Sequence, residues 1–405
     1  MLVRILTLEN QRQITNQLEK IGVDKRGISI MAPKADFFVA KIDRLSSIAA
    51  NILKQEMLSL GGEVAISRWS ITAKQKTTPC LLMGNKSQFN RLMEKIKVQP
   101  FDLRLVSQKL NESLLNYEKE MLHLKVKRFN FLTGKKTKIM GIINITFDSF
   151  SQDGLLRNFN SKEKLERLVL NKAISMVRAG ADIIDIGAES SRPGAKPISA
   201  KEEKSRLLPA LKLLIKEINV PISVDTYKPE VAKLALDNGA SIINDITGLS
   251  NPKMRKYISA YKAAAVIMHM QGRPQTMQKS PHYLCLLGEI IDFFEKRIKA
   301  AVESGIDFES LVIDPGIGFG KTLEHNIEIL KNLREFRILG RPILVGVSRK
   351  SFIGMITKKD VSERLFGTAA AVAVSVNNGA DIVRVHDVEQ IKQVLLICDK
   401  IKRAY

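Results

Sequence analysis

The sequence predicts an α/β protein, with a (β/α)8 barrel over residues 136–405 preceded by a smaller α/β domain over residues 1–135. From Lys138 onward, short apolar runs alternate with longer helical patterns, as expected for parallel strands buried on both faces. Polar residues follow the carboxyl end of every run, which is where barrels place their active sites. A doubly wound open sheet is the alternative, but it would gather these residues at one switch point.

The barrel elements repeat along the second domain. Eight strand–helix units occupy the part of the chain after Lys138, and barrels of this kind usually have about 250 residues. The predicted strands are Ile139–Asn144, Ile183–Gly187, Ile222–Asp225, Ile242–Asp245, Ala264–His269, Leu311–Asp314, Ile343–Val347 and Ile382–Val385. The predicted helices are Lys162–Ala179, Lys201–Ile218, Pro229–Asn238, Lys253–Lys262, Leu287–Ser304, Leu323–Leu333, Val361–Asn378 and Val388–Lys402.

The first domain is predicted to mix strands and helices without a cluster of catalytic residue types. Its strands are expected at Phe37–Ile42, Glu63–Ser67 and Pro79–Gly84, and its helices at Ser46–Leu60, Lys86–Lys95 and Glu112–Lys127. Gly61 and Gly62 are typical of a helix C-terminus. The last helix is expected to connect the two domains.

Composition excludes several classes of protein. The net charge of +22 is compatible with a nucleic-acid partner, but the basic residues are scattered and no aromatic RNA-binding motif accompanies them. We therefore expect no nucleic acid. No apolar run is long enough to span a bilayer, and charge interrupts the N-terminus too early for a signal peptide. Three widely separated cysteines indicate neither disulfides nor a zinc site, so a cytoplasmic protein is expected.

Polar residues at the strand ends are predicted to form one pocket. Each alone could simply cap a helix, and Asp225 is as compatible with a cap as with a site. Asp245 and Asp387 are interpreted as structural. Capping does not require six or more polar strand ends around one mouth. The rim set is Asn144, Asp185, Glu189–Arg192, Asp225, Asn244, Asp245, His269, Gln271, Asp314, Ser348–Ser351, Arg384, His386 and Asp387.

Two glycine-containing loops indicate an anionic substrate. Asp185–Gly194 ends in Arg-Pro-Gly and suits a flap that presents one guanidinium to an anion. Asp314–Thr322 resembles a phosphate-binding P-loop, but Pro315 occupies the position where that motif requires glycine. A nucleotide triphosphatase is therefore not indicated.

The charges of the rim suit a diphosphate beside a neutral ring. Arg192, Lys350, Arg384 and His386 would neutralise the diphosphate, and Asp225 and Asp314 would face the ring as carboxylates. No Ser-His-Asp arrangement and no rim cysteine supports a covalent mechanism. Magnesium is compatible with Asn144 together with a diphosphate.

Together these motifs resemble the dihydropteroate synthase family over residues 138–405. The similar segments are Met140–Ser151, Gly187–Ala195, Val224–Val231, Ile243–Ile246, Met268–Gly272, Asp314–Lys321, Gly346–Ser351 and Arg384–His386. The resemblance does not extend over the first domain. It implies condensation of 6-hydroxymethyl-7,8-dihydropterin diphosphate with 4-aminobenzoate to 7,8-dihydropteroate and pyrophosphate, with Mg²⁺ as cofactor and a homodimer as the assembly.

The resemblance also assigns roles to residues. Those implied for the pterin ring are Asp225, Asn244, Asp314 and Lys350 as polar partners, Ile246, Met268, Phe319 and Gly346 as the slot, and Arg384 stacked over it. The diphosphate set is Asn144, Arg192 and His386, with Asn144 as the Mg²⁺ ligand. The 4-aminobenzoate set is Phe150, Ser191, Pro193, Lys350 and Ser351. Asp225, Asp314 and Lys350 are the expected catalytic residues. Phe147 stands where the family usually has proline.

Two alternatives remain open at the level of sequence. A methyltetrahydrofolate:corrinoid methyltransferase would share the pterin carboxylates. It has less use for the loop of Arg192, for the segment Arg349–Ser351 and for Arg384 and His386, which argue for a diphosphate. A basic pterin- or nucleic-acid-binding protein with an inactive barrel is the non-enzymatic alternative, and the intact rim argues against it.

Overall fold

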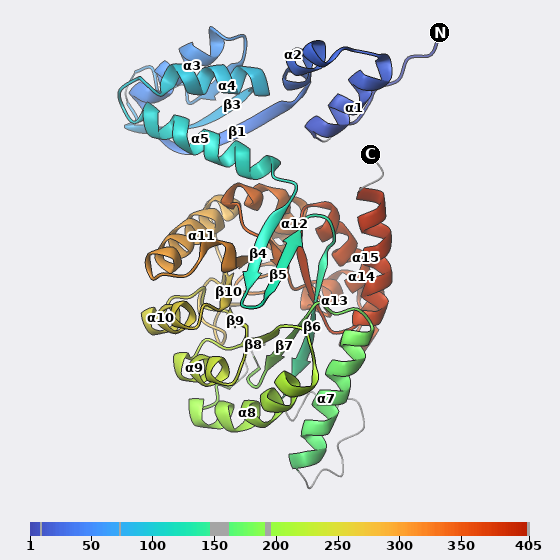
Figure 1. The fold of residues 1–405 in the computed structure, drawn as a ribbon. Coiled ribbons are helices and arrows are strands. Elements are labelled where there is room, and N and C mark those ends of the chain that lie inside the picture. Colours follow the sequence, from blue (N-terminus) through green and yellow to red (C-terminus); the bar gives the residue numbers. More distant parts are fainter. Residues whose placement is uncertain (9, 73, 146–161, 191–195, 403–405) are drawn as a thin grey trace. The chain divides into compact units, whose positions relative to one another are not determined.

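The computed structural model describes residues 1–8, 10–72, 74–145, 162–190 and 196–402. It divides the chain into two compact units, Met1–Glu118 and Lys119–Ala404 (Figure 1). The division lies before Lys119, whereas the sequence placed the domain limit at residues 135 and 136. The segment 119–135 therefore belongs to the second unit.

The first unit contains a three-stranded antiparallel sheet in the order β1-β3-β2. Alternate residues on one sheet face, such as Val64, Cys80 and Leu82, are buried against the helices. Ser46 and Asn85 cap the helices that follow β1 and β3, as short polar side chains favour. Its elements are α1 (Gln11–Ile21), α2 (Lys25–Ala35), β1 (Phe37–Ser46), α3 (Ser47–Leu58), β2 (Glu63–Ile66), β3 (Thr77–Asn85), α4 (Lys86–Ile96) and α5 (Leu103–Glu118).

The helix predicted over Glu112–Lys127 is wrong beyond Glu118. There α5 ends, and a hairpin follows, formed by β4 (Leu122–Val126) and β5 (Phe129–Thr133). The side chains of β4 are alternately buried and exposed, which is the period of a strand and not of a helix. Leu124 and Val126 pack with residues from the interior of the barrel, so the hairpin extends the barrel core.

Eight parallel strands form the sheet of the second unit, in the order β11-β10-β9-β8-β7-β6-β13-β12. A parallel bridge between Ile313 and Ile343 joins the two ends of this order and closes the barrel. The strands are β6 (Lys138–Asn144), β7 (Ile183–Gly187), β8 (Ile222–Asp225), β9 (Ile242–Asp245), β10 (Ala264–Met268), β11 (Leu311–Asp314), β12 (Leu344–Val345) and β13 (Ile382–Val385). The predicted (β/α)8 barrel is confirmed.

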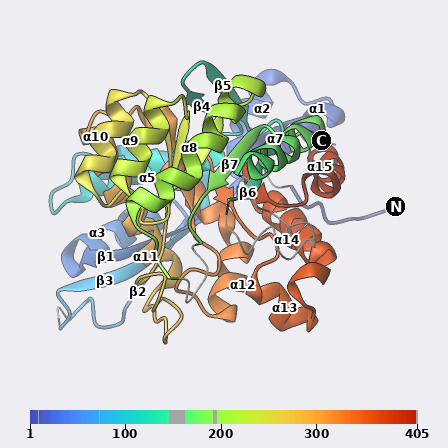
Figure 2. The ribbon, with the colours of Figure 1, turned by 90° about the horizontal axis from the view of Figure 1, so that it is seen from below.

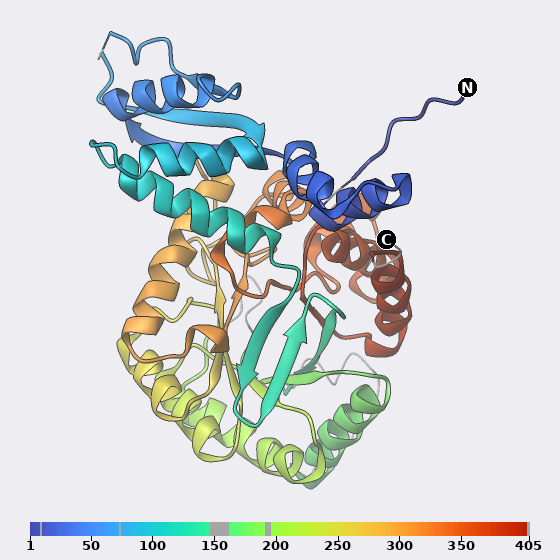
Figure 3. The same ribbon diagram turned by 45° about the horizontal axis from the view of Figure 1, so that its top comes forward.

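Helices surround this sheet, as the views from below and from the tilted top show (Figure 2; Figure 3). They are α7 (Lys162–Arg178), α8 (Ala200–Glu217), α9 (Pro229–Asp237), α10 (Pro252–Ala260), α11 (Leu286–Glu303), α12 (Leu323–Lys331), α13 (Ser351–Thr357), α14 (Leu365–Asn377) and α15 (Val388–Lys402). The sequence missed α13. It also joined a 3₁₀ turn at Val361–Glu363 to α14, and the structure separates them at Arg364.

The parallel strands bring their carboxyl ends to one mouth. Asn144, Asp225, Asp245 and Asp314 are each the last residue of a strand.

Among the described residues, no helix has the length and apolarity that crossing a bilayer requires.

Candidate active site

A buried arginine joins two carboxylates at the mouth of the barrel. Arg384 lies on β13, Asp185 on β7 and Asp225 at the end of β8. The Nε of Arg384 donates to Asp185 Oδ2 at 2.6 Å, and its Nη2 donates to Asp225 Oδ2 at 2.8 Å. The Asp185 side chain is fully buried, and those of Arg384 and Asp225 are 19% and 15% exposed. Asp225 therefore serves the mouth and does not cap α9.

The acidity of Asp225 is set by opposing effects. Burial raises the pKa of its carboxyl to about 7, and the nearby charges of Asp185 and Glu203 act in the same direction. The guanidinium of Arg384 opposes this rise. Asp225 thus titrates close to neutral pH, as groups at functional sites often do.

Two buried oxygens at this mouth have no hydrogen-bond partner among the described residues. They are Oδ1 of Asp185 and Oδ1 of Asn244, whose Nδ2 lies 3.4 Å from Asp185 Oδ2. Buried acceptors are normally satisfied, and leaving one unpaired costs about 1–3 kcal/mol. Both oxygens are therefore available to N–H donors of a bound ligand.

Asp314 is positioned by the glycine loop that follows it. Its Oδ1 accepts from the backbone N–H of Gly316 at 2.7 Å, and burial raises the pKa of its carboxyl. Gly316 has φ of +67°, and a Cβ there would lie 2.0 Å from the carbonyl oxygen of His269. The glycines thus permit close packing of two loops, and the N–H of Gly318 is bound by Asn326. This agrees with the interpretation that the loop is not a P-loop.

Lys350 lies at the same mouth, at the N-cap of α13. Its Nζ donates to the carbonyl of Ile317 at 2.5 Å and lies 4.2 Å from the ring centre of Phe319. Burial lowers the pKa of its ammonium to about 8, and the charge of Arg384 contributes to the lowering. The lysine therefore contacts the glycine loop and a residue that the sequence predicted to shape the ring slot.

His386 differs from the cation that the sequence predicted for the diphosphate, and the neighbouring Arg349 is held in an ion pair. Burial, with the charges of Arg384 and Arg349, lowers the pKa of His386 to about 3, so its imidazole is neutral near pH 7. Its Nδ1 lies 3.0 Å from Ser348 Oγ. Arg349 forms a two-point ion pair with Asp387, with Nε–Oδ2 at 3.1 Å and Nη2–Oδ1 at 2.5 Å. Asp387 is therefore structural, as interpreted.

The remaining described residues of the prediction also lie at the carboxyl side of the strands. Ile246 and Met268 are each 4% exposed, and a Cβ added at Gly346 would lie 3.9 Å from the Cβ of Arg384. Asn144 ends β6, and Ser351 begins α13. Asp245 is structural as interpreted, because its carboxylate accepts from the backbone of its own loop. Phe147, Phe150, Ser191, Arg192 and Pro193 lie outside the described residues.

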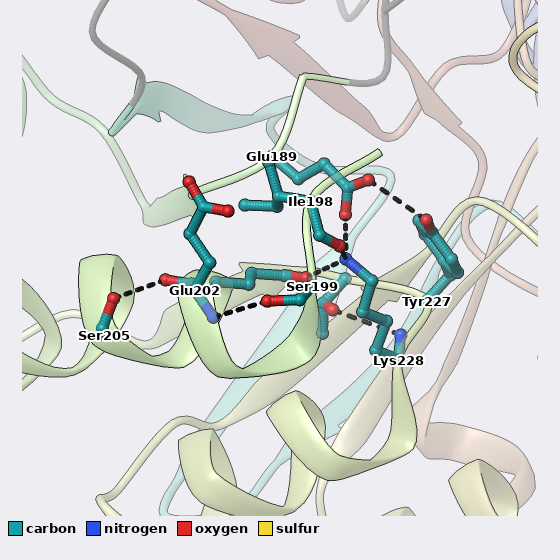
Figure 4. Close-up of polar contacts among 9 residues, drawn as sticks. Glu189, Ile198, Ser199, Glu202, Ser205, Tyr227 and Lys228 are labelled. Carbon is teal, nitrogen blue, oxygen red and sulfur yellow. Dashed lines mark hydrogen bonds and ion pairs between the residues drawn. The ribbon is translucent and has the colours of Figure 1, made fainter. Parts of the chain in front are cut away.

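A second cluster of charges lies next to Asp225. Lys228 pairs with Glu189 and Glu203, and Tyr227 donates to Glu189 (Figure 4). Glu189, Glu203, Asp225 and Tyr227 line one hollow together with Ser190, Thr226, Ile246, Pro274 and Gln275. Sequence reasoning gave no role to Lys228 or Glu203. Lys228 was detectable from its place three residues after Asp225, but Glu203 lies within a helical pattern without any signal.

No group of three or more His, Cys, Asp or Glu side chains is arranged to hold a metal ion in the part of the chain that the structure describes. Asn144, the last residue of β6, would offer one amide oxygen to a Mg²⁺ ion, and the oxygens of a ligand would supply the others. Such a donor set fits magnesium, which commonly binds few protein groups together with substrate phosphates.

Comparison with known proteins identifies the family. Residues 140–386 match the family described as pterin binding enzyme. Dihydropteroate synthase of Synechocystis is 45% identical over 272 residues, which are 67% of this chain and 92% of that protein. The bifunctional dihydropteroate synthase/dihydropteroate reductase of Helicobacter pylori is 34% identical over 385 residues, which are 94% of each protein.

A solved structure agrees. Dihydropteroate synthase of Thermus thermophilus, in complex with 4-aminobenzoate, superposes with a TM-score of 0.61 at 37% identity and covers 69% of this chain and 99% of its own. These relatives favour the synthase over the corrinoid methyltransferase alternative, so the resemblance seen in the sequence is confirmed. The chain belongs to the dihydropteroate synthase family of pterin-binding enzymes, the transferases that act in folate biosynthesis.

Proposed function

We propose that the barrel unit condenses 6-hydroxymethyl-7,8-dihydropterin diphosphate with 4-aminobenzoate, with release of pyrophosphate. The observation that carries this assignment is the pair of unpaired buried acceptors on Asp185 and Asn244 beside Asp225. A pterin ring carries several N–H donors on one edge, and such acceptors would bind that edge. We infer the reaction from family membership, and we infer the binding site of the pterin ring from these two acceptors.

The pterin site is proposed from the residues that gather at the mouth. Asp225, Asn244, Asp314 and Lys350 would bind the polar edge of the ring, together with the unpaired Oδ1 of Asp185. Ile246, Met268, Phe319 and Gly346 would form its slot, and Arg384 would stack over it. The ion pairs of Arg384 support this role, because they hold its guanidinium plane in a fixed orientation.

The diphosphate is assigned to Asn144, Arg192 and His386, with Mg²⁺ bound by Asn144 and by the diphosphate itself. The metal would withdraw negative charge from the leaving group. A neutral His386 would contribute as a hydrogen-bond donor and not as a charge, since its pKa lies well below neutral. The 4-aminobenzoate site is assigned to Phe150, Ser191, Pro193, Lys350 and Ser351, in line with the ligand of the Thermus thermophilus relative.

The chemistry follows from the charges at the mouth. Departure of pyrophosphate leaves positive character on the pterin methylene, and the carboxylates of Asp225 and Asp314 would stabilise it as it develops. The amine of 4-aminobenzoate is neutral at pH 7 and already nucleophilic, so no strong base is required. Lys350 would serve both substrates by linking the ring site to the 4-aminobenzoate site.

The assembly and the location are proposals on the same footing. We propose a homodimer in the cytoplasm, supported by family membership and by the absence of a bilayer-spanning helix among the described residues.

A second activity is proposed for the first unit. The Helicobacter pylori relative is matched over 94% of both chains, which includes this unit, and its name adds dihydropteroate reductase to the synthase. A groove between α4 and α5, lined by Asn90, Lys97, Arg104 and Asn111 among others, is where a reducing cofactor would be sought. The first unit would then reduce the product of the barrel.

The synthase is tested by supplying pterin diphosphate, 4-aminobenzoate and Mg²⁺ to the full chain and measuring pyrophosphate. We expect release that requires the amine, and loss of at least about 100-fold in kcat for Lys350→Ala, because that residue contacts both substrates. Pyrophosphate release without the amine, or methyl transfer to a corrinoid in its place, would contradict the assignment.

The pH profile tests the roles of Asp225 and Lys350. Asp225 acts as a carboxylate, so kcat/KM for pterin diphosphate should fall as pH drops through about 7. Lys350 acts as an ammonium, so kcat/KM should also fall as pH rises through about 8. Ionisation of the substrate's phosphates affects kcat/KM equally in Asp225→Asn and in the wild type. The fall of kcat/KM at low pH that is due to Asp225 should therefore disappear in Asp225→Asn. An unchanged limb in this variant would refute the role of Asp225.

The reductase is tested by adding 7,8-dihydropteroate and reduced nicotinamide, with and without a flavin, to the full chain. We expect oxidation of the nicotinamide to depend on dihydropteroate and to persist in Lys350→Ala, whose synthase activity is expected to fall at least about 100-fold. No substrate-dependent oxidation under either condition would leave the chain with the synthase alone.

A further inference from the structure

We propose that Lys228 is a positioning residue for the condensation. It lies near Asp225 and binds Glu189 and Ile198, which precede and follow residues 191–195. This inference rests on the proposed function of the barrel. Lys228 lies at the N-terminus of α9, three residues after Asp225, and its side chain makes no capping hydrogen bond to that helix. The ammonium instead donates to acceptors outside α9.

Three acceptors from three places in the chain surround the ammonium. Its Nζ donates to Glu203 Oε2 on α8 at 2.6 Å and to the carbonyl of Ile198 at 2.8 Å, and it also pairs with Glu189 Oε2. Figure 4 shows the Lys228 side chain between Glu189 and the segment of Ile198 and Ser199. An ammonium has three N–H donors, so this arrangement satisfies all of them.

The cluster is buried, unlike the surface ion pairs of the same unit. The side chains of Lys228, Glu189 and Glu203 are 14%, 10% and 1% exposed. The pair of Lys233 and Asp237, on the same helix, is 47% and 38% exposed. Surface pairs of that kind contribute little, whereas removing one partner of a buried pair leaves an uncompensated charge.

The position of the cluster in the chain gives it a role in the reaction. Glu189 precedes residues 191–195 and Ile198 follows them, and Lys228 holds both. The hydroxyl of Tyr227 adds a second bond to Glu189 at 3.1 Å. Ser191, Arg192 and Pro193 are the residues that we assign to 4-aminobenzoate and the diphosphate. Lys228 would therefore act on those ligands through the chain, while the pterin ring depends on Asp225, Asn244 and Asp314.

Substitution of Lys228 should then separate the two substrates. In Lys228→Met, we expect kcat/KM for 4-aminobenzoate to fall ~10- to 100-fold, because small misplacements far from the reacting atoms have effects of this size. The affinity for 6-hydroxymethylpterin, which lacks the diphosphate, should stay at the wild-type value when measured by calorimetry. Lys228→Arg keeps the charge and should recover part of the loss. Lys233→Met is the matched control and should change neither quantity.

A milder variant keeps the test informative if Lys228→Met does not fold. Tyr227→Phe removes only the hydroxyl bonded to Glu189, and it should raise KM for 4-aminobenzoate with unchanged pterin affinity. If the wild type is active and the Lys228 and Tyr227 variants have unchanged kinetics for 4-aminobenzoate, the inference is overturned. It is also overturned if pterin affinity and kcat/KM for 4-aminobenzoate fall equally, because a merely structural role would give that result. A wild type without any product would overturn the proposed function itself.

Discussion

The site depends on one buried interaction, the guanidinium of Arg384 held between Asp185 and Asp225. These residues come from β13, β7 and β8, so the interaction links three strands at the mouth of the barrel. An isolated charge at such depth would be costly, and each partner here compensates another. Because Arg384 occupies one oxygen of Asp185, the other oxygen remains as an unpaired acceptor next to Asn244. This unpaired oxygen is one of the two acceptors that we propose for the pterin ring.

A second lysine-centred cluster extends this arrangement outward. Lys228 pairs with Glu189 and Glu203, and the charge of Glu203 adds to the rise in the pKa of Asp225. Arg384 and Lys228 therefore each join two of the acidic residues on this side of the mouth. Lys350 contacts the glycine loop that begins at Asp314, through the carbonyl of Ile317. The overall charge of +22 is not what defines the site, since Arg384 and Lys228 are each paired with two carboxylates there.

Much of the barrel was predictable because its strands are short apolar runs that end in a polar residue. Ile183–Gly187, Ile222–Asp225 and Leu311–Asp314 were predicted with the observed limits. The hairpin after Glu118 was missed, because the pattern of β4 is short and follows a genuine helix without a break. The partners of Arg384 were not predictable either, since a sequence does not say which rim residues face one another. The neutral state of His386 likewise depends on burial and on two neighbouring guanidinium groups.

A double-mutant cycle on Asp185 and Arg384 tests the central claim most directly. The measured quantities are the free energy of unfolding in urea and the affinity for 6-hydroxymethylpterin, for Asp185→Asn, Arg384→Met and the double variant. Arg384→Met should lose about 3–5 kcal/mol, because it leaves two buried carboxylates uncompensated. Adding Asp185→Asn should restore at least about 1 kcal/mol of stability, and pterin affinity should be lost in every variant. Additive losses of stability, with pterin affinity intact, would contradict the account.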